Sequence, residues 1–103
     1  MINKKQAENK VISYLNLFCE DDKMILIEGN TIERDFGWIF FYDSKNHVET
    51  GDLRYAIAGN SPILVERKTG FIYETGTAKP VDHYIHLYEN GELSAVNLKT
   101  SLL

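Results

Sequence analysis

Two histidines and an aspartate in the segment "PVDHYIHLY" are the first candidates for chemistry in this chain of 103 residues. His83 and His86 are three residues apart and Asp82 precedes His86 by four, so a helix would bring the three side chains near one another. Histidine and carboxylate groups placed in this way can bind zinc, but a third ligand at suitable spacing is missing. The same helix would turn its apolar residues to the opposite side, so we interpret the histidines as part of a solvated face. We expect no metal site here.

The other candidates for catalysis lack the surroundings that catalysis needs. Cys19 is the only cysteine, which excludes an internal disulfide, and the "EDD" that follows it disfavours the thiolate form of a nucleophile. Ser44, Ser61 and Thr77 do not stand in G-x-S-x-G or a comparable motif, and the chain has no glycine loop for phosphates. We therefore expect a protein that is not an enzyme and that needs no cofactor.

Some of the acidic residues are candidates for recognition instead. Asp35, Glu49 and Asp52 belong to predicted loops or their edges, where binding residues concentrate, and Asp43 ends an aromatic strand. These four residues are the predicted partner-binding site. The alternative is that each of them is an ordinary solubilising charge.

The overall charge limits the class of partner. Eleven basic and fifteen acidic residues give a net charge of −4. This balance argues against nucleic acid and against an anionic membrane surface, because both need a basic patch. It is compatible with a basic protein partner, which an acidic field would attract.

The elements that must position these residues begin with a predicted helix over residues 4–18. Its apolar residues recur at helical spacing, and Asn3 with Gln6 forms a capping-box pattern at its start. Residues 23–33 begin as a β-like run that Gly29 and Asn30 interrupt, which indicates a bulge or bend. Residues 37–43, "GWIFFYD", are typical of a strand.

The second half of the chain shows a hairpin and a second helix. Residues 44–61 have a weak apolar pattern, and we expect an irregular loop there. "PILVER" and "FIYET" flank "KTG", a hairpin with Gly70 at the left-handed position. Pro80 suits the first turn of a helix that Asn90 and Gly91 end. Residues 91–103 are interpreted as a short edge strand and a mobile tail.

The aromatic strand raises a question of coverage, because it is apolar on both faces. Trp38, Phe40 and Tyr42 point to one side, and Ile39 and Phe41 point to the other. We expect both helices to pack on the tryptophan side. The second side then needs either the segment 44–61 or a binding partner, and coverage by the chain itself is favoured.

These elements predict an α+β fold in one domain, residues 1–103. Short turns join the strands into an antiparallel sheet of about four to five strands, on which an N-terminal and a C-terminal helix pack. No signal peptide or membrane-spanning run is visible, so we expect a cytoplasmic protein. An exposed strand edge would allow a homodimer.

Several segments, in this order, resemble the YrhB-like family of bacterial immunity proteins, the group numbered thirty-five among polymorphic-toxin immunity domains. The segments that carry the resemblance are "DFGWIFFY", "AGNSPILV" and "TGTAKP", and it covers most of residues 7–90. It implies a small cytoplasmic α+β domain that binds and neutralises a cognate toxin by stoichiometric contact. It supplies no catalytic residues.

Three functions are therefore considered. The first is immunity to a toxin through protein–protein interaction. The alternative is a chaperone-like or stress-tolerance role, which has also been suggested for the family and which predicts exposed apolar surface for unfolded clients. The third is an enzyme, which requires that carboxylate or histidine groups converge in one cleft.

Overall fold

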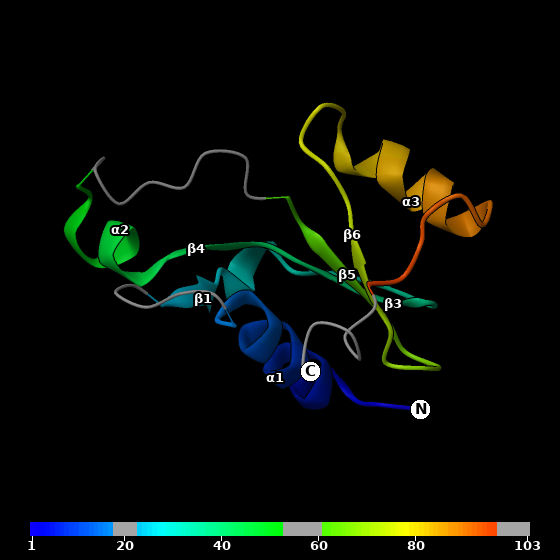
Figure 1. Cartoon of the computed structure of the whole chain (residues 1–103), viewed down its shortest axis with the longest axis horizontal. Coiled ribbons are helices and arrows are strands. Elements are labelled where there is room, and N and C mark those ends of the chain that lie inside the picture. Colours follow the sequence, from blue (N-terminus) through cyan, green and yellow to red (C-terminus); the bar gives the residue numbers. More distant parts are fainter. Residues whose placement is uncertain (18–22, 53–60, 97–103) are drawn as a thin grey trace.

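Two antiparallel sheets share one bent stretch of chain, residues 37–44 (Figure 1). The computed structural model describes residues 1–17, 23–52 and 61–96. The elements in these ranges are α1 (Lys4–Leu15), β1 (Met24–Leu26), the 3-10 turn η1 (Glu28–Asn30), β2 (Ile32–Arg34), β3 (Gly37–Phe40), β4 (Tyr42–Ser44), α2 (Lys45–Thr50), β5 (Ile63–Glu66), β6 (Ile72–Glu74) and α3 (Val81–Glu89).

The main sheet has four strands in the order β2-β3-β5-β6, and β1 pairs with β4 in a second sheet of two strands. Leu26 pairs with Tyr42, and Ile32 pairs with Ile39. The segment from Leu26 to Ile32 therefore has three more residues between these pairs than the segment from Ile39 to Tyr42. The turn η1 takes up this excess, which confirms the bend predicted at Gly29. All pairings between these strands are antiparallel, and the α+β class is confirmed.

Helix α1 covers the face of the main sheet that carries Trp38 and Phe40. Asn3 caps the helix, and its side chain and that of Gln6 bond each other's backbone N–H, so the predicted capping box is confirmed. The Tyr14 hydroxyl donates to Glu74 Oε1 at 2.5 Å and ties the helix to the edge strand β6. The buried side chains of this cluster are Ala7, Val11, Trp38, Phe40, Ile63, Val65 and Ile72.

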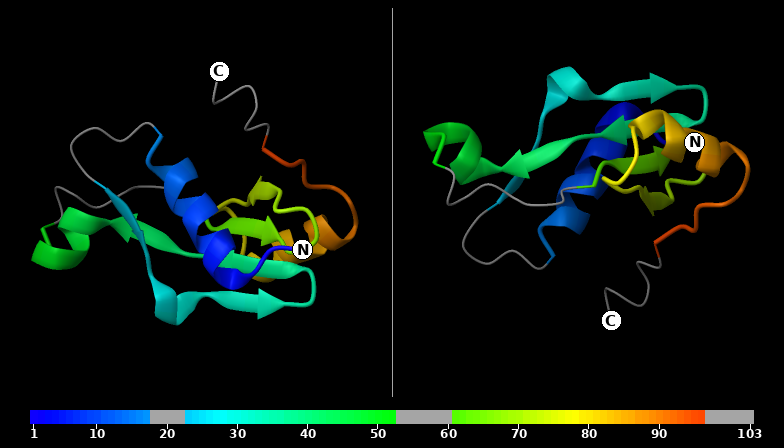
Figure 2. Two further views of the ribbon diagram at one scale, coloured as in Figure 1. Left: turned by 90° about the horizontal axis from the view of Figure 1, so that it is seen from below. Right: turned by 90° about the horizontal axis from the view of Figure 1, so that it is seen from above.

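Helix α3 lies on the opposite face, and the expectation that both helices share the tryptophan side is wrong (Figure 2). Ile85 packs there with Ile39 and Leu64, and all three are buried. Strand β5 is apolar on both faces, as β3 is, so the sheet has two apolar faces and each one needs a helix. Ile39 therefore needs neither the loop nor a partner to cover it, whereas Phe41 stays partly exposed.

The irregular loop expected over 44–61 is also wrong for its first part. Residues Lys45–Thr50 form α2, whose N-cap Ser44 accepts a hydrogen bond from the His47 N–H. Gly51 ends the helix in the left-handed conformation, with φ +70°. Residues 53–60 of that loop lie outside the described part, as does Cys19.

The hairpin and the second predicted helix are confirmed. Gly70 has φ +77° in the β5–β6 turn, and Asn90 and Gly91 follow the last turn of α3. Of the predicted C-terminal edge strand, the described residues show a single bridge between Ala95 and Tyr73. Within the described ranges, no helix is long and apolar enough to span a bilayer.

Candidate partner-binding site

The turn between β2 and β3 carries Asp35, one of the four predicted site residues, and Arg67 holds this turn in place. The Arg67 N–H donates to the Phe36 carbonyl at 2.7 Å. The Arg67 guanidinium donates to the Arg34 carbonyl at 3.1 Å and forms an ion pair of 3.2 Å with Glu33. Its carbon lies 4.5 Å from the centre of the Trp38 ring, a cation–π contact. Arg67 thus ties the turn to the end of β5 through backbone and side-chain contacts.

An acidic groove of about 330 Å³ separates this turn from α3. Asp82 and Glu89 line it from the helix and Asp35 lines it from the turn, with Arg34, Phe36, Ile85 and His86 completing the walls. The turn therefore lines the same groove as Asp82 and His86, two of the three residues considered above as zinc ligands. No group of three His, Cys, Asp or Glu side chains that could hold a metal occurs among the described residues.

A tilted aromatic pair supports the other side of the turn. The rings of Phe36 and Tyr88 are 4.7 Å apart, and the Tyr88 hydroxyl donates to Glu66. Burial and the neighbouring carboxylate raise the pKa of Tyr88, and the hydrogen bonds from Thr69 and Tyr88 hold the pKa of Glu66 below its usual value. A second groove, of about 300 Å³, lies beside this aromatic pair, with Arg67 and Lys68 among its lining residues.

This hydrogen bonding predicts an acid-sensitive step in stability. Because Glu66 has a lower pKa in the folded chain, its contribution is complete above its usual pKa of 4.5 and is lost as the pH falls through the lower folded value. We expect Glu66→Gln to flatten the fall of the urea midpoint between pH 5 and pH 3. Glu92→Gln, at an exposed position, should keep the wild-type profile, and equal profiles for wild type and Glu66→Gln would contradict the assignment.

The other three predicted site residues lie around α2. The carboxylate of Asp43 accepts from the Ser44 N–H at 2.7 Å and contacts His47 Nδ1 at 2.7 Å, so it supports the start of the helix. Glu49 is exposed and lies 3.8 Å from Lys45 in an ion pair of the kind that contributes little on a surface. Asp52 follows the helix end, where its N–H donates to the Thr50 hydroxyl at 3.1 Å.

The structure therefore divides the four acids into two patches. Asp35 is at one end of the bent stretch 37–44 and α2 is at the other, and extended chain rises about 3.3 Å per residue (Figure 2). Only Asp35 lines a groove among those described above. We name the surface around it, formed by Arg34, Asp35, Phe36, Asp82, His86 and Glu89, the acidic turn surface.

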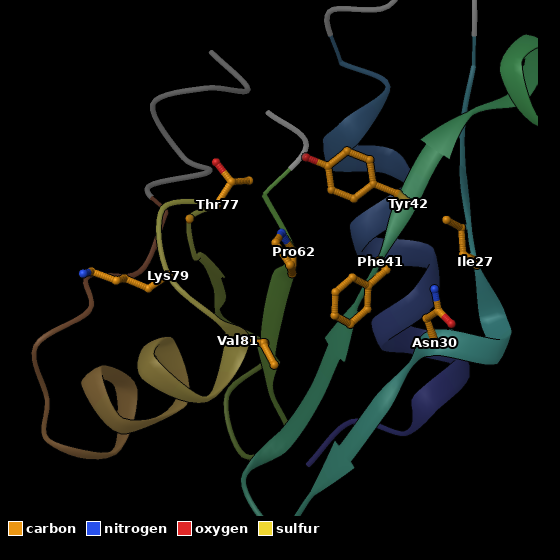
Figure 3. Close-up of a pocket in the computed structure, with 9 residues that line it drawn as sticks. Ile27, Asn30, Phe41, Tyr42, Pro62, Thr77, Lys79 and Val81 are labelled. Atoms are coloured by element: carbon orange, nitrogen blue, oxygen red, sulfur yellow. The ribbon is translucent and has the colours of Figure 1, made fainter. Parts of the chain in front are cut away.

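A third hollow, of about 330 Å³, lies where the two sheets separate, and we name it the inter-sheet groove (Figure 3). Its lining residues come from η1, the link between β3 and β4, the start of β5 and the link from β6 to α3: Ile27, Asn30, Phe41, Tyr42, Pro62, Gly76, Thr77, Lys79 and Val81. Each of the three segments that carry the family resemblance contributes described residues to this groove: Phe41 and Tyr42, Pro62, and Gly76, Thr77 and Lys79.

Sequence reasoning missed most of the lining residues. Arg67 and Tyr88 attach the turn, yet they are 32 and 53 residues away from Asp35 in the chain, and no local pattern links them. The segment "TGTAKP" lines the inter-sheet groove, and its Gly76 lies close to the Tyr84 ring. A Cβ on Gly76 would lie 2.6 Å from the Tyr84 hydroxyl.

Comparison with known families gives the class of the protein. The family described as Immunity protein 35 matches residues 5–87, which is most of the chain and includes both sheets and nearly all of α1 and α3. The chain belongs to this family, and the resemblance seen in the sequence is confirmed.

Among individual proteins, the chain is similar to the "Uncharacterized protein YrhB" of Escherichia coli (strain K12). The two are 40% identical over 53 residues, which are 52% of this chain and 56% of the relative. The match thus spans little more than half the length of this curated relative. No solved structure matches the chain.

Proposed function

We propose that this protein binds a cognate bacterial toxin in a stoichiometric complex and neutralises it in the cytoplasm without catalysis. Membership of the Immunity protein 35 family carries the proposal, because it points to toxin immunity in general. The net charge of −4 supports a basic partner, which it would attract over long range.

The acidic turn surface is the part of the molecule that best suits the contact. Protein interfaces are enriched in aromatic and arginine side chains, and here Phe36, Arg34 and three carboxylates surround one groove. The bonds from Arg67 fix the turn, so binding would cost little ordering entropy. Asp43, Glu49 and Asp52 form a second acidic patch around α2, and we propose it as a weaker contact for the same basic toxin.

Charge reversal at the turn tests this proposal. The protein would be co-expressed with the toxin encoded beside its gene, and the complex measured by size exclusion and by growth rescue. We expect Asp35→Lys to weaken toxin binding about tenfold, mainly by placing a cation opposite a basic surface. Asp35 is exposed, so the variant should fold normally.

Matched variants give this test its controls. Glu92→Lys makes the same charge change at an exposed position outside both patches and should keep wild-type affinity. Glu49→Lys should have a smaller effect than Asp35→Lys. Absence of any complex and of any rescue by the wild-type protein would contradict immunity to that toxin, and protection of unrelated unfolded clients in the same preparations would support the chaperone-like role instead.

A further inference from the structure

We propose that two copies of this chain exchange residues 92–96, so that this segment of each copy pairs with the outer edge of β6 in the other copy. We name residues 92–96 the closing segment. The exchanged pair repeats contacts that each chain makes with itself, so the occupant of this edge is the one already seated on it. The proposal does not depend on toxin binding.

The outer edge of β6 presents backbone groups that β5 does not bond. The Thr75 N–H donates to the Pro62 carbonyl at 3.2 Å, and the bonding of an antiparallel pair alternates along its register. The N–H and C=O of Tyr73 therefore point to β5, whereas those of Ile72 and Glu74 point away from it. Of these outward groups, the Ile72 carbonyl alone has a hydrogen bond within the described part of the chain.

The closing segment returns from α3 to this edge and meets it at one bridge (Figure 1). Ala95 forms this antiparallel bridge with Tyr73, and the Val96 N–H donates to the Ile72 carbonyl at 2.7 Å. The Val96 side chain is half-buried and packs against the cluster under α1. These contacts define the direction, the register and one apolar anchor of a strand added to β6.

The link between α3 and the bridge contains a hinge. Gly91 has φ +73°, and the Glu92 N–H donates to the Leu87 carbonyl at 2.8 Å, so the chain is held at the end of the helix. Leu93 and Ser94, which follow, make no hydrogen bond within the described ranges. A change of their backbone angles moves the end of the closing segment away from β6 while α3 stays in place.

The opposite edge of the main sheet is less suited to a second copy. Strand β2 carries exposed charges at Glu33 and Arg34, and the Arg34 guanidinium donates to the Glu33 carbonyl at 3.0 Å. Charged side chains protect a strand edge from pairing, and here one of them also bonds the backbone. We therefore place the second copy at β6.

Protein concentration decides between the closed and the exchanged form, because both make the same contacts at the bridge. A short link gives the closing segment an effective concentration of about 1 mM at the edge of its own chain. We therefore expect monomers at micromolar concentration and a substantial fraction of dimer at about 1 mM.

Disulfide trapping in the Cys19→Ser background tests the exchange. Opposed residues of an antiparallel pair lie within disulfide range, so Tyr73→Cys in one chain and Ala95→Cys in another join in register only if the closing segment crosses between copies. The two variants are mixed in equal amounts at about 1 mM in a glutathione redox buffer. We expect about threefold more covalent dimer than from Tyr73→Cys mixed with Lys5→Cys, an exposed position on α1.

Two further measurements separate the exchange from the closed contact. The double variant Tyr73→Cys, Ala95→Cys should form its disulfide within one chain at micromolar concentration, which verifies the register. Wild-type protein at about 1 mM should contain a dimer in sedimentation velocity that Val96→Pro lacks, because proline removes the N–H bonded to Ile72. Covalent dimer at the control level, or equal sedimentation of wild type and Val96→Pro, would overturn the proposal. A double variant that forms no disulfide within one chain would overturn it as well.

Discussion

Gly37→Ala should leave most of the chain unfolded. Gly37 begins β3 with φ +149°, and a Cβ built on it would lie 2.0 Å from the Val65 carbonyl oxygen and 2.9 Å from the Arg67 nitrogen. Neither atom has room to shift freely, because β5 is paired on both sides in the main sheet and the Arg67 N–H donates to the Phe36 carbonyl. We expect a loss of roughly 4 kcal/mol or more, which is comparable to the whole stability of a small domain. Urea denaturation followed by circular dichroism measures it.

A second glycine provides the control for this prediction. A Cβ on Gly29, in η1, would meet nothing within 4 Å, and its φ is not positive. Gly29→Ala should therefore change the free energy of unfolding by less than about 0.5 kcal/mol. A Gly37→Ala protein that unfolds at the wild-type urea concentration would show that the close approach of β3 and β5 is wrong.

Ile85→Ala should destabilise the protein by about 2–4 kcal/mol, because it opens a cavity between α3 and the sheet. Ile85 is 7% exposed and packs on Ile39 and Leu64. Ile12→Ala is the matched control on α1, where the side chain is 39% exposed, and it should cost less than about 1 kcal/mol. Thermal or urea unfolding of the two variants gives the comparison.

Tryptophan fluorescence shows on which face each helix packs. Trp38 is the only tryptophan, and it belongs to the cluster under α1 together with Val11. We expect Val11→Ala to alter the native emission of Trp38, whereas Ile85→Ala should leave it unchanged. If both variants alter it equally, the two helices do not lie on opposite faces.

The elements that local chemistry defines were predictable. The capping box at Asn3, the left-handed Gly70 and the end of α3 at Asn90 each depend on residues within one turn of chain, and all three are confirmed. The bend at Gly29 was predicted for the same reason, although its form, a single 3-10 turn, was not.

The arrangement of these elements was not predictable from the same patterns. Helical periodicity shows that one side of α3 is apolar, but both faces of β3 are apolar and either one could receive it. The short α2 was missed because its Ser44 cap and Gly51 end enclose only six residues, too few for a periodic pattern.

For the candidate site, the sequence allowed single residues to be selected but did not show which of them lie together in the fold. Asp35 was selected because it lies in a turn, but its groove depends on Asp82 and Glu89, which only the position of α3 brings near. Asp43 was selected because it ends the aromatic strand, and the structure shows its carboxylate bonded to Ser44 and His47. Its part in partner binding stays a prediction.

The most direct test of toxin neutralisation by stoichiometric binding is a titration of the toxin's activity with the purified protein. We expect the activity to fall in proportion to added protein and to reach zero at one equivalent, with an unchanged toxin recovered when the complex is dissociated. Progressive inactivation by a small fraction of one equivalent, or full activity in the presence of excess protein, would contradict it.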